Sequence, residues 1–325
     1  MKDREERLIP ITLLVPTRNE EANIEKCLHS AHGLIDQIFV IDSESEDETV
    51  SIARRYAEVI NLPYDHSKII PWIYQWGLDN LPIRNDWVMI LEADQALTRE
   101  LKDELRTLFT KPEIPEKGFY VRRQQVFRGR PLRFGGYGSK YMLKLFRRSV
   151  GELDAEETDT RVYVRGAIGK LKSPIVEENL KENEILFYLQ KHLRYADVFA
   201  REELLRREES ANWKTEPRLF GTPDQRILWL KALYFRLPLY VRPFAYFFYR
   251  YIILLGMLDG KEGGIFHFLQ AFWFRLVIDM RLEELQKAAD VTPHRKLKGA
   301  RTSAYGSLIV RSRKQSFKSD KLPIK

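Results

Sequence analysis

The first 110 residues alternate between short apolar runs and segments with helical spacing, and this alternation constrains the fold more than any other feature of the sequence. Apolar runs rich in branched side chains are typical of buried parallel strands. We expect strands at 8–15, 37–42, 57–63 and 87–91 and helices at 19–31, 45–57, 68–82 and 98–109. Strands and helices in turn predict an α/β fold, a mostly parallel sheet with helices on both faces.

Polar residues follow three of the predicted strands, at the point where each strand ends. The segments concerned are 17–20, 42–45 and 92–95. Ligands of open α/β sheets bind outside the carboxyl ends of the strands, so we expect these residues to share one site. The sequence contains no Gly-x-Gly-x-x-Gly or Walker loop, so a dinucleotide or P-loop site is not expected.

Two carboxylates separated by one residue, Glu92 and Asp94, follow the fourth apolar run. Hard cations such as Mg²⁺ or Mn²⁺ prefer oxygen ligands and often bind substrate phosphates as well. Such a cation neutralises the charge that develops on a departing diphosphate. A solvated acidic loop is the alternative for a triplet of this kind. Asp42 could accept the imide N–H of a uracil ring, or it could serve as a turn residue.

The middle of the chain differs in character. It predicts strands at 118–127, 139–146 and 161–166, a Gly- and Arg-rich loop at 128–138, and a long helix at 182–209. A diphosphate or an anionic acceptor could be gripped by guanidinium groups, whose fork fits phosphate; the candidates are Arg122, Arg123, Arg128, Arg130 and Arg133. Solvated loop charges are the alternative.

Residues 226–278 are dense in aromatic side chains with basic residues between them. No uninterrupted run of 18 apolar residues is present, so a plain transmembrane helix is not predicted. Aromatic helices punctuated by arginine suit a membrane interface, with the charges reaching the headgroups. A buried helical subdomain is the alternative.

Charge is unevenly distributed along the chain. Residues 291–325 contain ten basic residues against Asp320, whereas the whole chain carries a net charge of +8, so the remainder is nearly neutral. The basic segment could attract anionic lipid, and we expect no nucleic-acid partner, because no broad basic face or zinc-finger pattern is present. The single cysteine excludes a disulfide framework and fits a reducing compartment. The charged start of the chain does not resemble a signal peptide, so we expect a cytoplasmic body.

The order of three segments gives a family resemblance. VPTRNEEANIEKCL, IDSESEDETVSIA and WVMILEADQALTREL together resemble the nucleotide-sugar domain of family 2 glycosyltransferases, which has the GT-A fold. The branch that it resembles holds bacterial lipopolysaccharide-core glucosyltransferase-like and related polysaccharide enzymes. Further similar segments are GRPLRFGGYG, VYVRGAIGKLKSPIVEENLK and RPFAYFFYRYIILLGMLDGKEG, so the resemblance covers roughly residues 8–285.

The resemblance assigns roles to particular residues. Pro16, Thr17, Arg18 and Glu20 match the turn that contacts the nucleoside, and Asp42 matches the uracil-binding acid. Glu92 and Asp94 match the Asp-x-Asp motif, in which Asp94 would be the metal ligand. Asp159 is the first candidate for the catalytic base and Glu157 the second, with Glu177 a third acid on a segment of unknown geometry. The sequence departs from the family pattern at Glu92, which replaces an aspartate, at Gln95, which replaces a common glutamate, and at Tyr74-Gln75, where a Lys/Arg-Asn pair is usual.

These observations together predict an inverting glycosyltransferase. It would use a nucleotide sugar, with UDP as the expected nucleotide and Mg²⁺ or Mn²⁺ as the cofactor, and act on a lipid-linked or cell-envelope saccharide. We expect a nucleotide-sugar and acceptor domain at 1–215, an apolar helical segment at 216–290 on an anionic membrane surface, and a flexible basic tail at 291–325. The enzyme would sit peripherally on the inner face of the cytoplasmic membrane. The alternatives are a transferase for a soluble acceptor and a non-catalytic scaffold that binds sugar nucleotides.

Overall fold

The computed structural model describes residues 8–63, 70–153, 161–208 and 216–291, and its centre is a curled mixed sheet. In spatial order the strands are β3 (Glu58–Asn61), β2 (Ile35–Asp42), β1 (Ile9–Thr17), β4 (Trp87–Ile90), β8 (Tyr141–Arg147), β6 (Gly118–Phe127), β11 (Ile168–Glu177) and β5 (Gln95–Leu97). The first four strands run parallel to one another, and β6 and β11 form a second parallel pair. β8 runs antiparallel to both of its neighbours, as β5 does to β11. Three short strands remain among the described residues: β7 (Arg130–Pro131) pairs with β6, and β9 (Gly151–Leu153) pairs with β10 (Val162–Val164).

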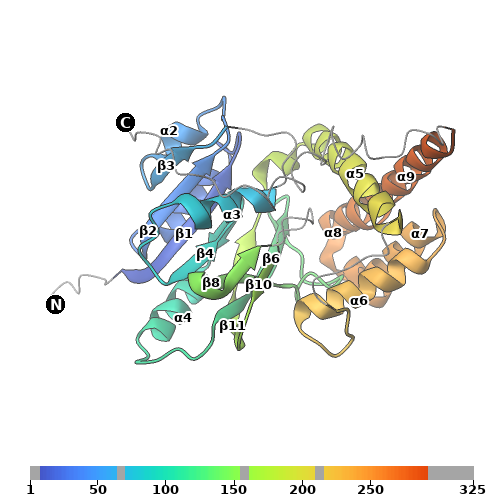
Figure 1. Ribbon diagram of the computed structural model, residues 1–325. Coiled ribbons are helices and arrows are strands. Elements are labelled where there is room, and N and C mark those ends of the chain that lie inside the picture. The colour runs from blue at the N-terminus through green and yellow to red at the C-terminus, as the bar shows by residue number, and fades with distance from the viewer. Residues whose placement is uncertain (1–7, 64–69, 154–160, 209–215, 292–325) are drawn as a thin grey trace.

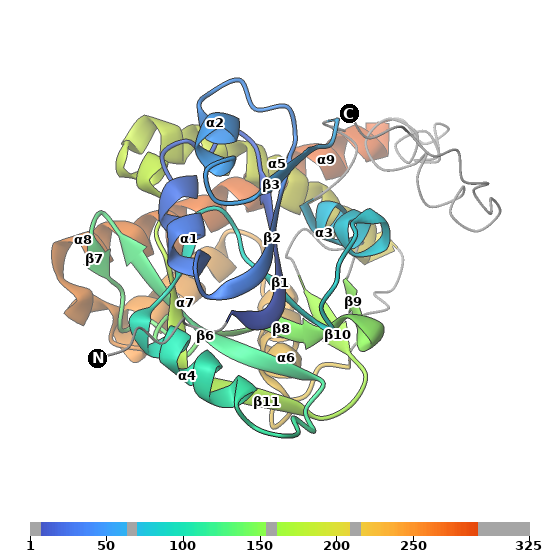
Figure 2. The same cartoon turned by 90° about the vertical axis from the view of Figure 1, so that its left-hand side faces the viewer.

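Helices cover both faces of the parallel part of the sheet. α1 (Ile24–Ala31) and α4 (Arg99–Phe109) pack on one face and α3 (Ile70–Asn80) on the other, while α2 (Thr49–Ala53) leads into β3 (Figure 2). Successive side chains of a strand point to opposite faces, so Leu13 joins the core under α1 and α4, and Leu14 joins the core under α3. Because both faces are covered, β1 and β4 are almost entirely buried.

The α/β fold class is confirmed, and the alternation over the first 110 residues is as predicted. β6 has the bounds 118–127 that the sequence predicts, and the long helix α5 (Ile185–Glu208) lies within the predicted range 182–209. Beyond β4 the sheet is mixed, and β5 and β11 were not expected. The predicted strand at 161–166 is observed as the shorter β10, which pairs with β9 outside the main sheet.

The last third of the described chain is helical and lies together on one side of the sheet (Figure 1). Its elements are α5, α6 (Pro223–Arg236), α7 (Val241–Phe248), the π-helical turn η3 (Tyr249–Ile253), the 3₁₀ turn η4 (Gly256–Asp259), α8 (Gly260–His267), the π-helical turn η5 (Phe268–Trp273) and α9 (Phe274–Val291). Tyr120 on β6 donates a hydrogen bond of 2.7 Å to Asp224 on α6, which fastens this helical part to the sheet.

A buried ionic cluster joins three of these helices. Arg242 on α7 is fully buried and donates two hydrogen bonds of 2.8 Å to Glu203 on α5 and one of 2.7 Å to Asp279 on α9. Both carboxylates are themselves buried. Removing one partner of such a cluster would leave an uncompensated charge in the interior, so the cluster fixes how the three helices pack.

The loop between β7 and β8 is bound to the helical part. The backbone amides of Arg133 and Phe134 donate to the carboxylate of Asp259, and the amide of Gly135 donates to the carbonyl of Leu254 at 2.8 Å. Gly135 has a φ of +62°, and a Cβ atom there would lie 2.0 Å from His267 Cε1. The Gly-rich sequence of this loop is therefore needed for close approach to α8.

Many large apolar side chains of the helical part are exposed. Within the described residues no single helix has both the length and the apolar composition to cross a membrane, but the bent pair Val241–Ile253 and Gly256–Ala288, which meet at 68°, passes that test of length and composition together. The exposed side chains of α7 and the turns after it include Val241, Phe244, Phe248, Ile253 and Leu258.

Candidate active site

The carboxyl ends of β2, β1 and β4 meet at one edge of the sheet, because these three strands are parallel neighbours. Thr17 at the end of β1 pairs with Asp42 at the end of β2, and the amide of Ser43 donates to the carbonyl of Thr17 at 2.9 Å. On the other side of β1, β4 leads directly into Glu92 and Asp94. The sheet thus places all three polar segments of the sequence along one edge.

Asp42 is 2% exposed and organises the turn after β2. Its Oδ1 accepts hydrogen bonds from the hydroxyls of Thr17 at 3.1 Å and Ser45 at 2.5 Å, and its Oδ2 accepts from the Ser45 amide at 2.9 Å. A carboxylate has about four acceptor positions, so Oδ2 keeps capacity for one more N–H donor. Asp42 therefore stabilises a turn, which was the alternative to uracil binding. Its carboxylate can still accept a hydrogen bond from one further donor.

The turn after β1 is locked against the turn after β2. The amide of Glu20 donates to the Thr49 hydroxyl at 2.7 Å, and the amide of Asn19, whose φ is +54°, donates to Ser45 Oγ at 2.8 Å. Pro16 is buried within β1, whereas Arg18 is exposed. The backbone of this turn is therefore held in place, with the Arg18 side chain directed outward.

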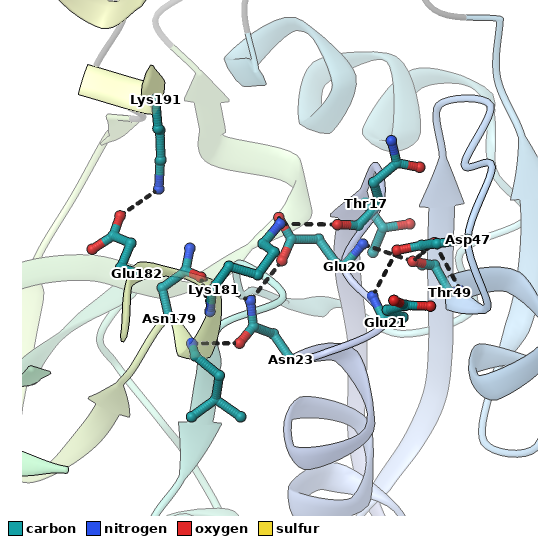
Figure 3. A network of polar contacts seen from close by, with 12 residues as sticks. Thr17, Glu20, Glu21, Asn23, Asp47, Thr49, Asn179, Lys181, Glu182 and Lys191 are labelled. Carbon is teal, nitrogen blue, oxygen red and sulfur yellow. Dashed lines mark hydrogen bonds and ion pairs between the residues drawn. The ribbon is translucent and has the colours of Figure 1, made fainter. Parts of the chain in front are cut away.

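Glu20 takes part in a network that reaches the segment after β11 (Figure 3). Its carboxylate accepts from Lys181 Nζ at 2.7 Å and from Asn23 Nδ2 at 2.7 Å. The Asn23 side chain in turn donates to Asn179 Oδ1 at 3.1 Å and accepts from the amide of Leu180 at 2.9 Å. Glu20 thus joins two distant parts of the chain at the strand-end edge, a role that the sequence did not indicate.

Gln95 separates two carboxylates beside the strand end. Its Nε2 donates to Glu177 Oε2 at 2.7 Å and to Glu92 Oε1 at 3.2 Å, and its Oε1 accepts from the Glu92 amide at 3.1 Å. Arg123 forms an ion pair of 2.9 Å with Glu177, and Lys144, 1% exposed, forms one of 3.3 Å with Glu92. Burial favours the neutral acid, but the charges of Arg123, Lys140 and Lys144 and the hydrogen bond from Gln95 together keep the pKa of Glu177 below its usual value.

Asp94 differs from these carboxylates because one of its oxygens is unsatisfied. Oδ1 is buried and has no hydrogen-bond partner. Burial raises the pKa of Asp94 well above its usual value, and the negative charges of Glu177 and Glu92 raise it further, against the opposing charge of Lys191. A buried carboxylate oxygen without a donor is costly, so the site lacks a positive partner at this atom.

The donor set fits a hard divalent cation that also binds phosphates. Asp94 Oδ1 is available, and Glu92, whose side chain is 37% exposed, has its second oxygen outside the contacts to Lys144 and Gln95. No group of three or more His, Cys, Asp or Glu side chains is close enough to hold a metal ion among the described residues. Mg²⁺ and similar cations are commonly held by one or two carboxylates together with substrate phosphates, so two ligands suffice.

One edge of the sheet therefore carries Thr17, Asp42, Glu92 and Asp94. Pro16 is a buried residue of β1, and Glu20 stabilises the turn that follows this strand. Asp159 and Glu157, the candidate bases, lie outside the described residues. The sequence indicated no role for Lys144 or Lys181, whereas Arg123, a candidate for gripping a diphosphate, forms an ion pair with Glu177. Lys144 could have been found, since it interrupts the apolar run of β8 and a lone charge in a buried strand needs a partner.

The known proteins to which the chain is similar include several glycosyltransferases. Residues 12–149 match the family model for glycosyl transferase family 2. An uncharacterized glycosyltransferase of Rickettsia bellii is 34% identical over 100 residues, which cover 30% of this chain and 32% of that protein. The glucosyl-3-phosphoglycerate synthase of Petrotoga mobilis is 40% identical over 101 residues, 29% of each chain. Matches thus span about a third of the length of these relatives.

Among solved structures, the chain is similar to a glucosyl-3-phosphoglycerate synthase from Mycobacterium tuberculosis, crystallised with Mn²⁺, UDP and glucosyl-3-phosphoglycerate. The sequence identity is 16% and the TM-score 0.34, and the match covers 53% of this chain and 72% of that one.

Proposed function

We propose that the chain, whose residues 12–149 match the family model for glycosyl transferase family 2, transfers a sugar from a UDP-sugar to a saccharide acceptor in a reaction that requires a divalent cation. The observation that carries this proposal is the unpartnered, buried Oδ1 of Asp94 at the carboxyl end of β4. It supports a cation at the edge of the sheet where the turns after β1 and β2 also lie.

The donor's nucleoside is proposed to bind over the turns after β1 and β2. Asp42 Oδ2 has capacity for the imide N–H of uracil, and the hydrogen bonds from Thr17 and Ser45 hold the carboxylate in place. The locked backbone from Arg18 to Glu20 would form the wall beside the base. Because these groups are held before the ligand arrives, little ordering is needed on binding.

The diphosphate is proposed to lie toward Asp94 and Glu92. A bound Mg²⁺ or Mn²⁺ would supply neutralisation of the charge on the leaving diphosphate. The chain's own residues hold the carboxylates around the cation in position. Lys144 holds Glu92 by an ion pair, and Gln95, being neutral, donates to both Glu92 and Glu177 where a third carboxylate would add repulsion. The departure of residue 95 from the family pattern thus has a physical reason.

The acceptor hydroxyl is proposed to attack C1 of the sugar on the side opposite UDP, which inverts the anomeric centre. The hydroxyl's proton passes to a carboxylate base, and UDP leaves with the electrons of the broken bond. Asp159 remains the first candidate for this base and Glu157 the second. Glu177 is less suited, because its ion pair with Arg123 lowers its pKa and so makes it a weaker base.

The exposed apolar side chains of α7 and the turns after it support a proposed attachment to the inner face of the cytoplasmic membrane. Phe244 is 61% exposed and Phe248 56%, and aromatic side chains are favourable at a membrane interface. A lipid-linked or cell-envelope saccharide is the acceptor that fits such a location. The basic segment 292–325, which is outside the described residues, would add attraction to anionic lipid.

Release of UDP from a panel of UDP-sugars, measured with and without Mn²⁺, tests the proposed activity. We expect the intact chain to release UDP in a Mn²⁺-dependent reaction. No saccharide acceptor is needed, because water can take its place in a slow hydrolysis. Asp94→Asn should reduce it roughly a hundredfold or more if the cation is lost, whereas Asp103→Asn, an exposed control on α4, should leave it unchanged. A folded chain that binds UDP but releases none from any donor would instead indicate a scaffold.

A further inference from the structure

Two half-buried arginines of the helical part have no acidic partner among the described residues. Arg250 lies on η3 and Arg275 on α9, and the Nε atom of each is buried with no hydrogen-bond partner. Neither forms an ion pair with a carboxylate of the described residues. Arg123 and Arg147 also have an unpartnered Nε, but their other nitrogens pair with Glu177 and Asp86.

Aromatic rings hold the two guanidinium groups close together. Arg250 Cζ lies 4.2 Å from the ring centre of Tyr137 and 5.5 Å from that of Tyr246, and its Nη1 donates to the Tyr246 hydroxyl at 2.8 Å. Arg275 Cζ lies 5.5 Å from the same Tyr246 ring. Both cations therefore flank one tyrosine, whose hydroxyl proton remains available for a further acceptor.

The surroundings do not neutralise these charges. The nearby His267 is neutral at physiological pH, because burial and the charge of Arg250 lower its pKa to about 4. The carboxylate of Asp259, 3.8 Å from His267, already accepts from the amides of Arg133 and Phe134. Burial would raise the pKa of Tyr246, but the charges of Arg250 and Arg275 outweigh it and lower the pKa.

Arg242 shows how the same helices treat an arginine with a structural role. Its guanidinium is paired with both Glu203 and Asp279, so its charge is fully compensated. Cation–π contacts offset only part of the cost of removing the Nε groups of Arg250 and Arg275 from water. A cluster with two uncompensated cations is therefore missing an anion.

We propose that Arg250, Arg275 and the Tyr246 hydroxyl form a binding site for a phosphate or diphosphate group of the acceptor. A guanidinium fork matches phosphate oxygens geometrically, and two forks with one hydroxyl supply donors to several of them. Asp94 and the turns after β1 and β2 serve the donor, so this second site belongs to the other substrate. The assignment to the acceptor depends on the proposed transferase function, whereas the phosphate site itself does not.

Binding of inorganic pyrophosphate to the intact chain in EDTA tests the site without metal at Asp94. We expect saturable binding that Arg275→Gln weakens roughly tenfold or more, since it removes charge-assisted hydrogen bonds. Arg250→Gln should act in the same direction. Arg275 makes no hydrogen bond within the described residues, so its variant should fold even if Arg250→Gln does not. Arg236→Gln, exposed on α6, is the matched control and should bind as the wild type does.

Asp94→Asn separates this site from the donor site and should leave metal-free pyrophosphate binding unchanged. Vesicles of phosphatidylcholine with and without phosphatidic acid then distinguish the source of the phosphate. A lipid phosphate is indicated if Arg275→Gln lowers flotation with phosphatidic acid, and a soluble one if only pyrophosphate binding falls. The proposal is overturned if the wild type binds no pyrophosphate in EDTA, or if Arg275→Gln and Arg236→Gln bind it equally. If the wild type binds pyrophosphate but does not bind UDP, the proposed function is contradicted and the phosphate site is not.

Discussion

Asp94 and Asp42 show how neighbouring strand ends give two carboxylates different properties. Asp42 accepts three hydrogen bonds from groups that are adjacent in the fold, whereas Asp94 has a buried oxygen without any donor. The sequence predicts both residues at the same edge, because each follows an apolar strand. It does not predict the difference between them, since the Thr17 donor to Asp42 comes from the neighbouring strand and the lack of a donor at Asp94 Oδ1 depends on its surroundings in the folded chain.

His267 gives a prediction about pH at the scale of one residue. Its pKa is lowered from 6.5 to about 4 by burial and by Arg250, against the opposing charge of Asp259. As pH falls, the unfolded chain binds the proton first, so stability is lost between about pH 6.5 and pH 4 and not further below. We expect this group to remove on the order of 2–3 kcal/mol over that range.

His267→Gln cannot bind this proton, so the difference in free energy of unfolding between wild type and variant should shrink as pH falls through the same range. Urea unfolding at the two ends of the range measures this difference. A constant difference would show that His267 does not titrate differently in the folded and unfolded states.

At the scale of elements, the sequence predicts those whose pattern is local. β6 has the bounds that its apolar run indicates, and α4 begins after Thr98, whose hydroxyl accepts from the Leu101 amide. β5 and β11 were not predicted because their pairing is tertiary. β5 has three residues, and its ladder runs against a strand about 80 positions later in the chain. The ion pair between Glu177 and Arg123 could not be predicted for the same reason, since it follows from the position of β11 beside β6.

The loop between β7 and β8 gives a prediction about close packing. Gly135→Ala would combine a φ of +62° with a Cβ atom 2.0 Å from the buried His267 ring, so we expect a loss of about 3–4 kcal/mol of stability. Gly129→Ala is the matched control, because its φ is +74° but no atom lies within 4 Å of the added Cβ. It should lose only about 1–2 kcal/mol. Urea unfolding compares the two variants, and equal losses would mean that the loop can move away from α8.

At the scale of the whole molecule, the strand-end site and the exposed apolar side chains belong to different parts. The sheet carries the residues proposed to bind the donor, and α7 with the turns after it, which carries the exposed aromatics, lies on the side away from β1 (Figure 1). The sequence indicates both parts by composition, but it leaves open whether 226–278 is buried or lies at a membrane. The exposure of Phe244 and Phe248 favours the hypothesis that this segment lies at a membrane, which vesicle binding can test.

We predict that the double variant Phe244→Ser and Phe248→Ser reduces flotation of the intact chain with anionic vesicles. Each exposed phenylalanine that enters the interface contributes about 1.5–3 kcal/mol, so the loss of both should exceed roughly a hundredfold in partition. Leu8→Ser is the control, because Leu8 is 44% exposed but precedes β1 of the sheet and is not part of the helical part. If the double variant floats as the wild type does, these aromatics do not enter the bilayer.

Calorimetric titration of UDP into the intact chain, with and without Mn²⁺, tests the central claim most directly: that the strand ends hold a nucleotide diphosphate through a cation at Asp94. We predict that Mn²⁺ strengthens UDP binding to the wild type and to the exposed control Asp103→Asn. Asp94→Asn should keep the weak metal-independent binding and lose the increase due to Mn²⁺. An equal response to Mn²⁺ in Asp94→Asn and the wild type would contradict the account.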